Sequence, residues 1–242
     1  MRAMILAAGL GTRLKPITNN IPKALVKVGN VTLLEICIKN LKMQEIADII
    51  INVHHFAEQI INFLAENNNF GVNISISDET GKLLNTGGGL KKAAWFFNDD
   101  KPFLLHNVDI ISNLNLKTLY DLHINSNATA TLAVRKRGSG RYLLFNSENI
   151  LCGWKNVETN EIISYVDVKL LEKYAFSGIH IIDPKIFSLM PNEKVFSMID
   201  LYLKVMNSNH IHGYIDKDSF WMDVGNPANL KIAGENIDKF MR

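Results

Sequence analysis

The stretch of sequence that decides the fold is Leu6-Ala7-Ala8-Gly9-Leu10-Gly11-Thr12-Arg13-Leu14-Lys15-Pro16. Residues 3–8, which lead into it, form a short apolar run that ends at a glycine, as a buried strand does. Glycines let the backbone approach an anion closely, and the exposed N–H groups can bind phosphate oxygens. The stretch therefore predicts a strand that runs into an anion-binding loop, although Gly-x-Gly alone is more often an ordinary tight turn.

Two familiar glycine motifs do not fit this loop. The dinucleotide fingerprint needs Gly-x-Gly-x-x-Gly at the start of a helix, but Leu14 holds the third glycine position and Pro16 follows it. The P-loop spacing Gly-x-x-x-x-Gly-Lys-Ser/Thr is absent as well. Instead, the cations Arg13, Lys15 and Lys23 follow the glycines. Each lysine alone is typical of a solvated surface, but an arginine fork and lysine point charges together could surround a polyphosphate.

Composition excludes several classes of protein. The chain has 242 residues, a formal charge of +2 and 47% hydrophobic residues, which supports a packed core and excludes a mainly disordered chain. A charge of +2 attracts nucleic acid weakly, so we expect no nucleic-acid partner. No uncharged apolar stretch reaches the roughly 18 residues of a membrane span, and the N-terminal run is too short for a signal peptide. Two cysteines make no disulfide scaffold, and we expect a cytoplasmic protein without membrane contact.

Strand-like and helix-like segments alternate through the first half of the chain. Apolar or alternating patterns predict strands at 3–8, 49–53, 72–76 and 103–106. Helical spacing predicts helices at 34–41, 56–64, 90–97 and 116–123. The first of these helices follows a capping box that starts at Thr32. This rhythm favours an α/β sheet with helices on its faces and right-handed crossovers.

The pattern becomes richer in strands after residue 127. Strands are predicted at 128–135, 142–145, 150–154, 175–182 and 210–215. Helices are predicted at 184–190, 198–206 and 226–241, the last with an Asn-Pro start. No proline-rich linker, internal repeat or low-complexity tract separates the two halves, so we expect one α/β domain with a β-rich second half.

The glycine stretch, taken together with Pro22-Lys23-Ala24-Leu25, resembles the signature of the sugar-1-phosphate nucleotidyltransferases, also called nucleoside-diphosphate-sugar pyrophosphorylases. The joint pattern L-A-A-G-x-G-T-R-L…P-K-x-L is highly specific. Further along, Asn85-Thr86-Gly87-Gly88-Gly89 resembles the E-T-G-G-G element of small bacterial members such as N-acetylmuramate 1-phosphate uridylyltransferase. Asparagine stands here in place of the glutamate.

Three later landmarks extend this resemblance over the whole chain. Residues 105–109 resemble the family's N-G-D element, with Val108 in place of the glycine. Residues 176–180 resemble the strand that lines the sugar pocket, and residues 221–225 resemble the W-x-D-V-G element. The landmarks follow in the same order as in the family.

The resemblance implies a Rossmann-like three-layer α/β/α fold with a mixed, mostly parallel central sheet, formed by a single domain of residues 1–242. Residues 1–127 would be the nucleotide-binding half, and 128–242 the sugar-binding and metal-completing half. By the same resemblance, Mg²⁺ lies on Asp109 and Asp223, and Arg13 and Lys23 are catalytic. The implied nucleotide contacts are Leu6, Ala7, Ala8, Gly9, Gly11, Thr12, Arg13, Gly87 and Asn107, and the implied sugar contacts are Asn107 and Gly178.

The implied reaction transfers a nucleotidyl group from a nucleoside triphosphate to a sugar 1-phosphate and releases pyrophosphate. The attacking phosphate is already an anion, so no Ser-His-Asp array is required. The glycine turn and the short chain favour uridylyl transfer. With the resemblance, we expect a role in the cell envelope and a monomer or small homo-oligomer. The base, the sugar and the pathway stay open.

Several alternatives also stay open. A nucleotidyltransferase acting on a phospho-alcohol such as phosphocholine would share the same loop and aspartates. A non-catalytic pyrophosphorylase-like regulatory subunit would tend to lose the cations or carboxylates that this chain retains. A metal-dependent glycosyltransferase would usually have Asp-x-Asp at the position where this chain has Asn107-Val108-Asp109. His210 and His212 lack a third nearby ligand, which makes a zinc site a weak hypothesis. The basic run 135–137 is typical of a solvated strand edge and could equally receive a sugar phosphate.

Overall fold

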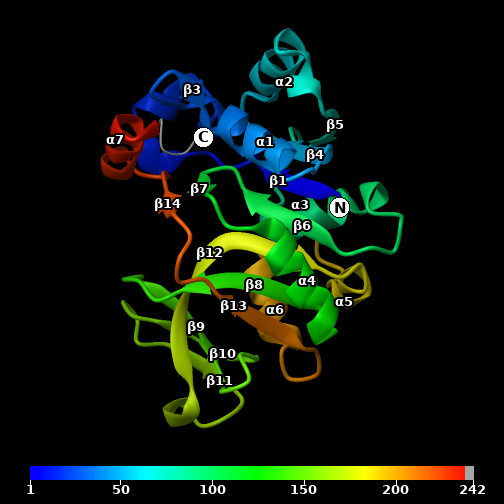
Figure 1. The fold of residues 1–242 in the computed structure, drawn as a ribbon, viewed down its shortest axis with the longest axis vertical. Helices are drawn as coiled ribbons and strands as arrows, with labels where there is room; N and C mark the ends of the chain where they lie inside the picture. The colour runs from blue at the N-terminus through cyan, green and yellow to red at the C-terminus, as the bar shows by residue number, and fades with distance from the viewer. Residues whose placement is uncertain (238–242) are drawn as a thin grey trace.

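Parallel strands from the N-terminal half form one side of a large sheet in the computed structural model, which describes residues 1–237 (Figure 1). Strand β1 (Ala3–Leu6) lies between β4 (Asp48–Val53) and β6 (Phe103–Asn107), and β5 (Asn73–Asp78) lies beyond β4. All of these pairs are parallel. The glycine loop leaves the carboxyl end of β1, where parallel α/β sheets commonly bind ligands.

The long strand β12 (Glu172–Ile182) crosses the middle of the sheet in the opposite direction. It pairs antiparallel with β6 on one side and with β8 (Ala130–Arg135) on the other, and β13 (Ile211–Ile215) pairs parallel with β8. Six of these seven strands are therefore parallel to one another: β5, β4, β1, β6, β8 and β13. Strand β12 is antiparallel to them. The expected mixed, mostly parallel sheet is confirmed.

An antiparallel extension is added to the first half of β12, at the bottom of Figure 1. It consists of β9 (Arg141–Phe145), β10 (Leu151–Asn156) and β11 (Ile162–Ser164), and β9 pairs with β12 at residues 172–174. Because β9 and β6 pair with different parts of the same edge of β12, a stretch of that edge between them carries no strand. The larger cavity described below opens at this interruption.

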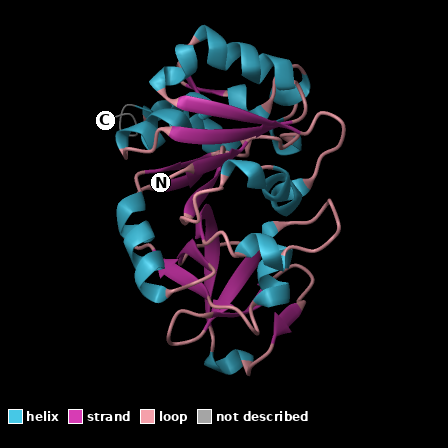
Figure 2. Ribbon diagram, turned by 90° about the vertical axis from the view of Figure 1, so that its right-hand side faces the viewer, coloured by secondary structure: helices cyan, strands magenta, loops and turns pink. Residues whose placement is uncertain are grey.

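Helices cover both faces of the sheet (Figure 2). Ala3 and Ile5 of β1 pack into one buried apolar cluster, and Met4 packs into another on the opposite face. The first cluster contains residues of α1 (Leu33–Met43), α2 (Ala57–Glu66), α4 (Leu116–Ser126) and α7 (Pro227–Glu235). The second contains residues of α3 (Asn85–Lys92), α5 (Ile186–Leu189) and α6 (Met198–Val205). The three-layer α/β/α arrangement is therefore confirmed.

Two helix starts agree with the sequence and one does not. The Thr32 side chain accepts a hydrogen bond from the Glu35 backbone N–H, and Asn226 caps α7, as expected. The helix expected at 90–97 begins instead at Asn85 and contains the three glycines, so that prediction is wrong. A Cβ on Gly88 would lie 2.1 Å from the Lys194 carbonyl oxygen, which explains why glycine is needed inside this helix.

Other boundaries differ by a few residues. The helix expected at 184–190 contracts to α5 (Ile186–Leu189), and helix α7 ends at Glu235. Residues 238–241 of the predicted 226–241 helix lie outside the described part of the chain. Two short ladders complete the fold: β2 (Lys27–Val28) pairs with β3 (Val31–Thr32), and β7 (Ile110–Ser112) pairs with β14 (Trp221–Asp223). Within residues 1–237, no helix combines the length and apolarity needed to cross a bilayer.

Candidate functional site

The glycine loop folds back onto the segment that carries Lys23. Gly11 has φ +65°, a conformation that L side chains rarely adopt. A Cβ there would also lie 2.9 Å from the Thr18 side chain and 3.1 Å from Cβ of Lys23. The Thr18 hydroxyl donates to the Gly11 carbonyl oxygen at 2.8 Å. Gly11 thus lets the loop and Lys23 approach each other closely.

A buried polar network holds the start of the loop. The Ala7 N–H donates to the Asn52 side-chain oxygen at 2.7 Å, and the Asn52 amide donates to Glu79 at 2.7 Å. The second carboxylate oxygen of Glu79 accepts the Leu84 N–H at 3.0 Å, just before α3. Asn52 and Glu79 are almost completely buried, and our sequence analysis missed both. An asparagine inside the apolar run 49–53 was the available signal.

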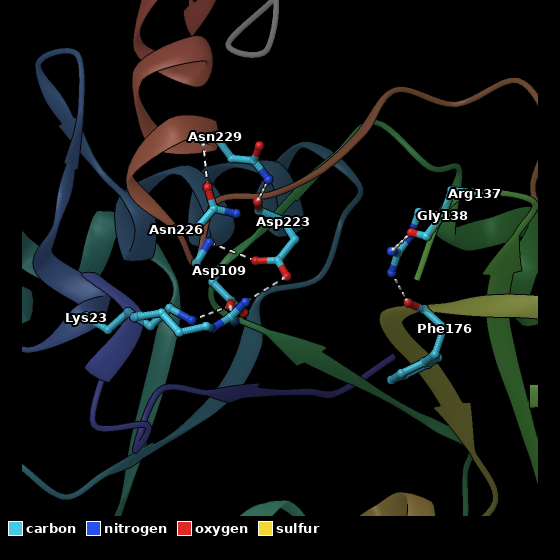
Figure 3. A network of polar contacts seen from close by, with 10 residues as sticks. Lys23, Asp109, Arg137, Gly138, Phe176, Asp223, Asn226 and Asn229 are labelled. Atoms are coloured by element: carbon cyan, nitrogen blue, oxygen red, sulfur yellow. Dashed lines mark hydrogen bonds and ion pairs between the residues drawn. The ribbon is translucent and has the colours of Figure 1, made fainter. Parts of the chain in front are cut away.

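Four charged side chains form a cluster next to this loop, and Figure 3 labels three of them, Lys23, Asp109 and Asp223. Lys23 makes an ion pair with Asp109, and both side chains are only 13% exposed. The Arg13 guanidinium lies 3.8 Å from Asp109 and 3.7 Å from Asp223. The structure thus brings together the two cations and the two acids that the resemblance singled out from distant parts of the sequence.

Backbone pairing brings the two aspartates together. The Val224 N–H donates to the Asp109 carbonyl oxygen at 2.9 Å, and Asp223 pairs with Ile110 in the β7–β14 ladder. The Gly225 N–H donates to the Asp223 carboxylate at 2.7 Å. A Cβ on Gly225 would lie 2.8 Å from an Asp223 oxygen and 3.0 Å from an Asp109 oxygen. An Arg13 guanidinium nitrogen lies 2.5 Å from the same position, so the two carboxylates and Arg13 converge on a space that any side chain at residue 225 would fill.

This arrangement fits a hard divalent cation. Within the described residues, no group of three or more His, Cys, Asp and Glu side chains is placed to hold a metal ion, so Asp109 and Asp223 would supply two carboxylates and leave the other positions to other ligands. Mg²⁺ prefers such oxygen ligands and commonly completes its shell with water and substrate phosphates. Both carboxylates already have cationic partners in this structure: Arg13 pairs with both, and Lys23 pairs with Asp109.

Two adjoining cavities open at this site. The smaller one, about 490 Å³, is lined by the loop residues 6–9 and by Lys23 and Asp109. The larger one, about 650 Å³, extends toward the antiparallel strands β9–β11. Their shared walls are Leu6, Asn85, Thr86 and Asn107. Molecules bound in the two cavities would therefore lie next to each other, and the one in the smaller cavity would lie beside Lys23 and Asp109.

The larger cavity combines aromatic and apolar walls with a few polar groups. Trp154 and Phe176 line it together with His180. The His180 Nδ1 atom lies 2.8 Å from the Tyr202 hydroxyl, and complete burial lowers the pKa of His180 to about 3. Burial likewise lowers the pKa of His106, the residue before Asn107, to about 4. Both imidazoles are neutral near pH 7.

Five of the ten expected contact residues line the cavities, and five line neither of them: Gly11, Thr12, Arg13, Gly87 and Gly178. Gly11 and Thr12 belong to the loop behind Arg13. The Gly87 N–H is already bonded to the Phe196 carbonyl oxygen at 2.9 Å, and a Cβ on Gly87 would overlap the Phe196 ring. Gly178 has φ +76°, and a Cβ there would lie 3.0 Å from the Asn107 amide nitrogen. Both glycines thus make room for these neighbours, and their contacts with a substrate stay predictions.

Comparison with known proteins defines the class to which this fold and site belong. The model of the nucleotidyl transferase family matches residues 2–239, and the chain belongs to this family. It is 30% identical to a UTP–glucose-1-phosphate uridylyltransferase of Synechocystis, over 93% of this chain and 60% of that protein. It is 28% identical to an N-acetylmuramate α-1-phosphate uridylyltransferase of Caulobacter vibrioides, over 96% of this chain and 95% of the relative.

Other relatives agree on the family and fold. A mannose-1-phosphate guanyltransferase of Yarrowia lipolytica is 29% identical over 95% of this chain, which spans 62% of the yeast protein. The chain thus covers about 60% of the length of two of these three relatives. Among solved structures, HddC of Yersinia pseudotuberculosis with GMP-PN superposes with a TM-score of 0.78 at 22% identity, covering 98% of this chain and 99% of HddC. That likeness supports the fold.

Proposed function

We propose that this chain transfers a nucleotidyl group from a nucleoside triphosphate to a sugar 1-phosphate, giving a nucleotide sugar and pyrophosphate, with Mg²⁺ as the cofactor. The observation that carries the proposal is the cluster of Arg13, Lys23, Asp109 and Asp223, of which Lys23 and Asp109 line the smaller of two adjoining cavities. Two reactants whose phosphate groups must meet need adjoining cavities with charged side chains nearby. Family membership and the names of the relatives support the same reaction.

The main barrier to this reaction is repulsion between anions. Two like charges about 4 Å apart repel by roughly 4 kcal/mol at an effective dielectric constant near 20. A phosphate oxygen of the acceptor attacks the α-phosphorus, and pyrophosphate leaves from the opposite side. Fixed positive charges lower the barrier most when they are already in place before reaction. We assign Arg13 to the departing pyrophosphate and Lys23 to the α-phosphate or the incoming phosphate.

The acids have a different task from the cations. Asp109 and Asp223 would hold Mg²⁺, which supplies charge neutralisation at the phosphate oxygens when it is bound. Arg13 and Lys23 then exchange their carboxylate partners for phosphate oxygens. No general base is needed, because the acceptor phosphate is already deprotonated. The low pKa values of His106 and His180, about 4 and about 3, agree with a reaction that uses neither as a base.

The assignment of the cavities follows from their contents. We assign the smaller cavity to the nucleotide, with contacts from the backbone of residues 6–9 and from Asn107, and the larger cavity to the acceptor. This matches the proposed division into a nucleotide-binding half, 1–127, and an acceptor half, 128–242, of one domain. Gly11 and Thr12 are proposed to shape the nucleotide loop.

The substrate is proposed at a finer level from the relatives. The Caulobacter relative, which has nearly the same length, is named as an N-acetylmuramate α-1-phosphate uridylyltransferase. We therefore propose uridylyl transfer to a sugar 1-phosphate for cell-envelope synthesis. A cytoplasmic location is proposed with it, supported by the two free, buried thiols of Cys37 and Cys152.

A panel of pyrophosphate-release assays tests the proposal. It crosses UTP, dTTP, GTP and CTP with a set of sugar 1-phosphates, phosphocholine and inositol 1-phosphate in the presence of Mg²⁺. We expect release with UTP and a sugar 1-phosphate, and none after Mg²⁺ is removed with EDTA. If pyrophosphate is released only with a phospho-alcohol, the acceptor is a phospho-alcohol and the proposed sugar 1-phosphate is wrong. No release with any pair would favour a non-catalytic subunit and contradict the proposal.

A further inference from the structure

Arg137, in the wall of the larger cavity, is a half-buried cation without a carboxylate partner. Its guanidinium donates to the carbonyl oxygens of Phe176 at 3.0 Å and Gly138 at 3.1 Å (Figure 3). Its Nε–H is buried and has no hydrogen-bond partner. Within residues 1–237, no ion pair is formed by Arg137. A buried donor without a partner is uncommon in folded proteins and marks a place where an acceptor is missing.

The two preceding cations behave differently. Arg135 forms an ion pair with Asp216 at 3.0 Å, and Lys136 forms one with Glu172 at 3.1 Å. Lys136 is mostly exposed and does not line the larger cavity. The three consecutive basic residues therefore include two with a counter-ion and one, Arg137, without. Burial lowers the pKa of Arg137, so the protein itself stabilises this charge poorly.

The position of Arg137 is nevertheless well fixed. Its guanidinium carbon lies 4.3 Å above the Trp221 ring, and the Trp221 indole N–H donates to the Ser177 carbonyl oxygen at 2.8 Å. Trp221 and Asp223 are alternate residues of β14, so they lie on the same side of that strand. The Asp223 charge partly offsets the burial that lowers the pKa of Arg137. Arg137 therefore interacts electrostatically with Asp223 while it lines the larger cavity.

A phosphate monoester supplies what Arg137 lacks. Its oxygens accept hydrogen bonds from a planar guanidinium, and its charge replaces the missing counter-ion. Arg13 and Lys23 do not line the larger cavity, whose cations are the half-buried Arg137 and the exposed Arg141. We propose that Arg137 binds the phosphate group of the acceptor and holds it toward the acidic pair, an inference that rests on the proposed function.

The test compares Arg137→Gln with Lys136→Gln, which removes the neighbouring charge outside the cavity. With the nucleotide and acceptor pair that reacts fastest in the panel, we expect Arg137→Gln to raise KM for the acceptor by about 10- to 100-fold, the usual loss of a hydrogen-bonded charge contact. KM for the nucleoside triphosphate should change by less than about twofold, because its contacts lie in the other cavity. Lys136→Gln should leave both KM values within about twofold of the wild type.

A binding experiment gives a second readout without turnover. Trp221 lies under Arg137 and Trp154 lines the same cavity, so tryptophan fluorescence should report a ligand bound there. We expect glucose 1-phosphate to change the emission of the wild type and of Lys136→Gln, with about tenfold more ligand needed for Arg137→Gln. Glucose without phosphate should have no effect. If all three proteins need the same glucose 1-phosphate concentration for a half-maximal change in emission, the role of Arg137 is overturned.

The outcomes separate this inference from the proposed function. An active wild type with the same acceptor KM in Arg137→Gln and Lys136→Gln overturns the inference alone. A wild type that is inactive with every pair overturns the proposed function and this inference with it. If Arg137→Gln does not fold, Arg137→Lys carries the test, because it keeps the charge and loses the planar fork. We then expect a severalfold rise in acceptor KM, and an unchanged KM overturns the inference.

Discussion

The two cavities are built in different ways. Backbone and ion pairs dominate the smaller one: the loop after β1 has no large side chain between Ala7 and Gly9, and Lys23 and Asp109 pair beside it. Side chains dominate the larger one, where Trp154 and Phe176 project from antiparallel strands. The first resembles an anion-binding cradle, and the second resembles a pocket for a larger organic group.

This difference between a cavity built from backbone and one built from side chains explains which part of the proposed function can be predicted from the sequence. A backbone cradle needs glycine and alanine at fixed positions, so it leaves a contiguous motif such as residues 6–13. A side-chain pocket takes single residues from several strands and leaves no motif. The transfer chemistry is therefore predictable from the sequence, whereas the identity of the acceptor is not.

The largest expected effect comes from the two acids of the charge cluster, Asp109 and Asp223. Asp109→Asn and Asp223→Asn preserve shape but remove the charge, and we expect each to lower kcat by about a thousandfold, since pre-placed charge carries the reaction. Pyrophosphate release measured across a range of Mg²⁺ concentrations checks this. Asp121→Asn, which changes only an exposed ion pair with Lys117, is the control. Near-normal rates in either site variant would contradict the metal assignment.

Lys23 comes next in size. We expect Lys23→Ala to lower kcat/KM at least a hundredfold, about 3 kcal/mol of transition-state stabilisation. Lys39→Ala, which removes a lysine paired with Glu35 on helix α1, should change the rate by less than about twofold. A loss below threefold for Lys23→Ala would mean that its ion pair with Asp109 is structural only.

The buried histidines behind the two cavities should weaken the fold in acid. The pKa values of His106 and His180 in the folded state are about 4 and about 3, below the ordinary 6.5. The unfolded chain therefore binds more protons between pH 6.5 and these values, and stability falls as the pH falls through this window. Each histidine should cost about 2 kcal/mol at pH 5. Urea unfolding at pH 7 and pH 5 measures the loss, and equal stability would contradict neutral burial.

The smallest effect should distinguish the cavities most cleanly. We expect Trp154→Ala to raise KM for the acceptor by about tenfold, because it removes an aromatic wall of the larger cavity, and to leave KM for the nucleotide unchanged. Trp95→Ala is the matched control, because Trp95 is 59% exposed and lines neither cavity. A larger rise in nucleotide KM than in acceptor KM would exchange the two cavity assignments.

Local signals in the sequence predicted much of the fold. The Thr32 capping box and the Asn226 cap lie where the sequence indicates, because caps depend on a few neighbouring residues. Helix α3 was placed too late, since glycines ordinarily weaken a helix. Here Gly88 and Gly89 give the room that the Lys194 carbonyl and Glu79 require, which is a tertiary constraint.

The candidate site was predictable only in part. Resemblance identified Asp109 and Asp223, but no spacing in the sequence brings them together; the β7–β14 ladder does. Asn52 and Glu79 were missed because a buried network joins two strands through side chains. Arg137 belonged to a basic run that looked like solvated surface, and only its missing counter-ion separates it from Arg135.

The central claim is that Asp109 and Asp223, one from each half of the chain, act on one cation. A double-mutant cycle on pyrophosphate release tests it directly, with Asp109→Asn, Asp223→Asn and the double variant measured at saturating Mg²⁺. Residues that act as one unit lose their effect together, so the double variant should be within about threefold of the slower single variant. If the fold-losses in rate of the two single variants multiply in the double variant, the two aspartates have independent roles, which would contradict the shared site.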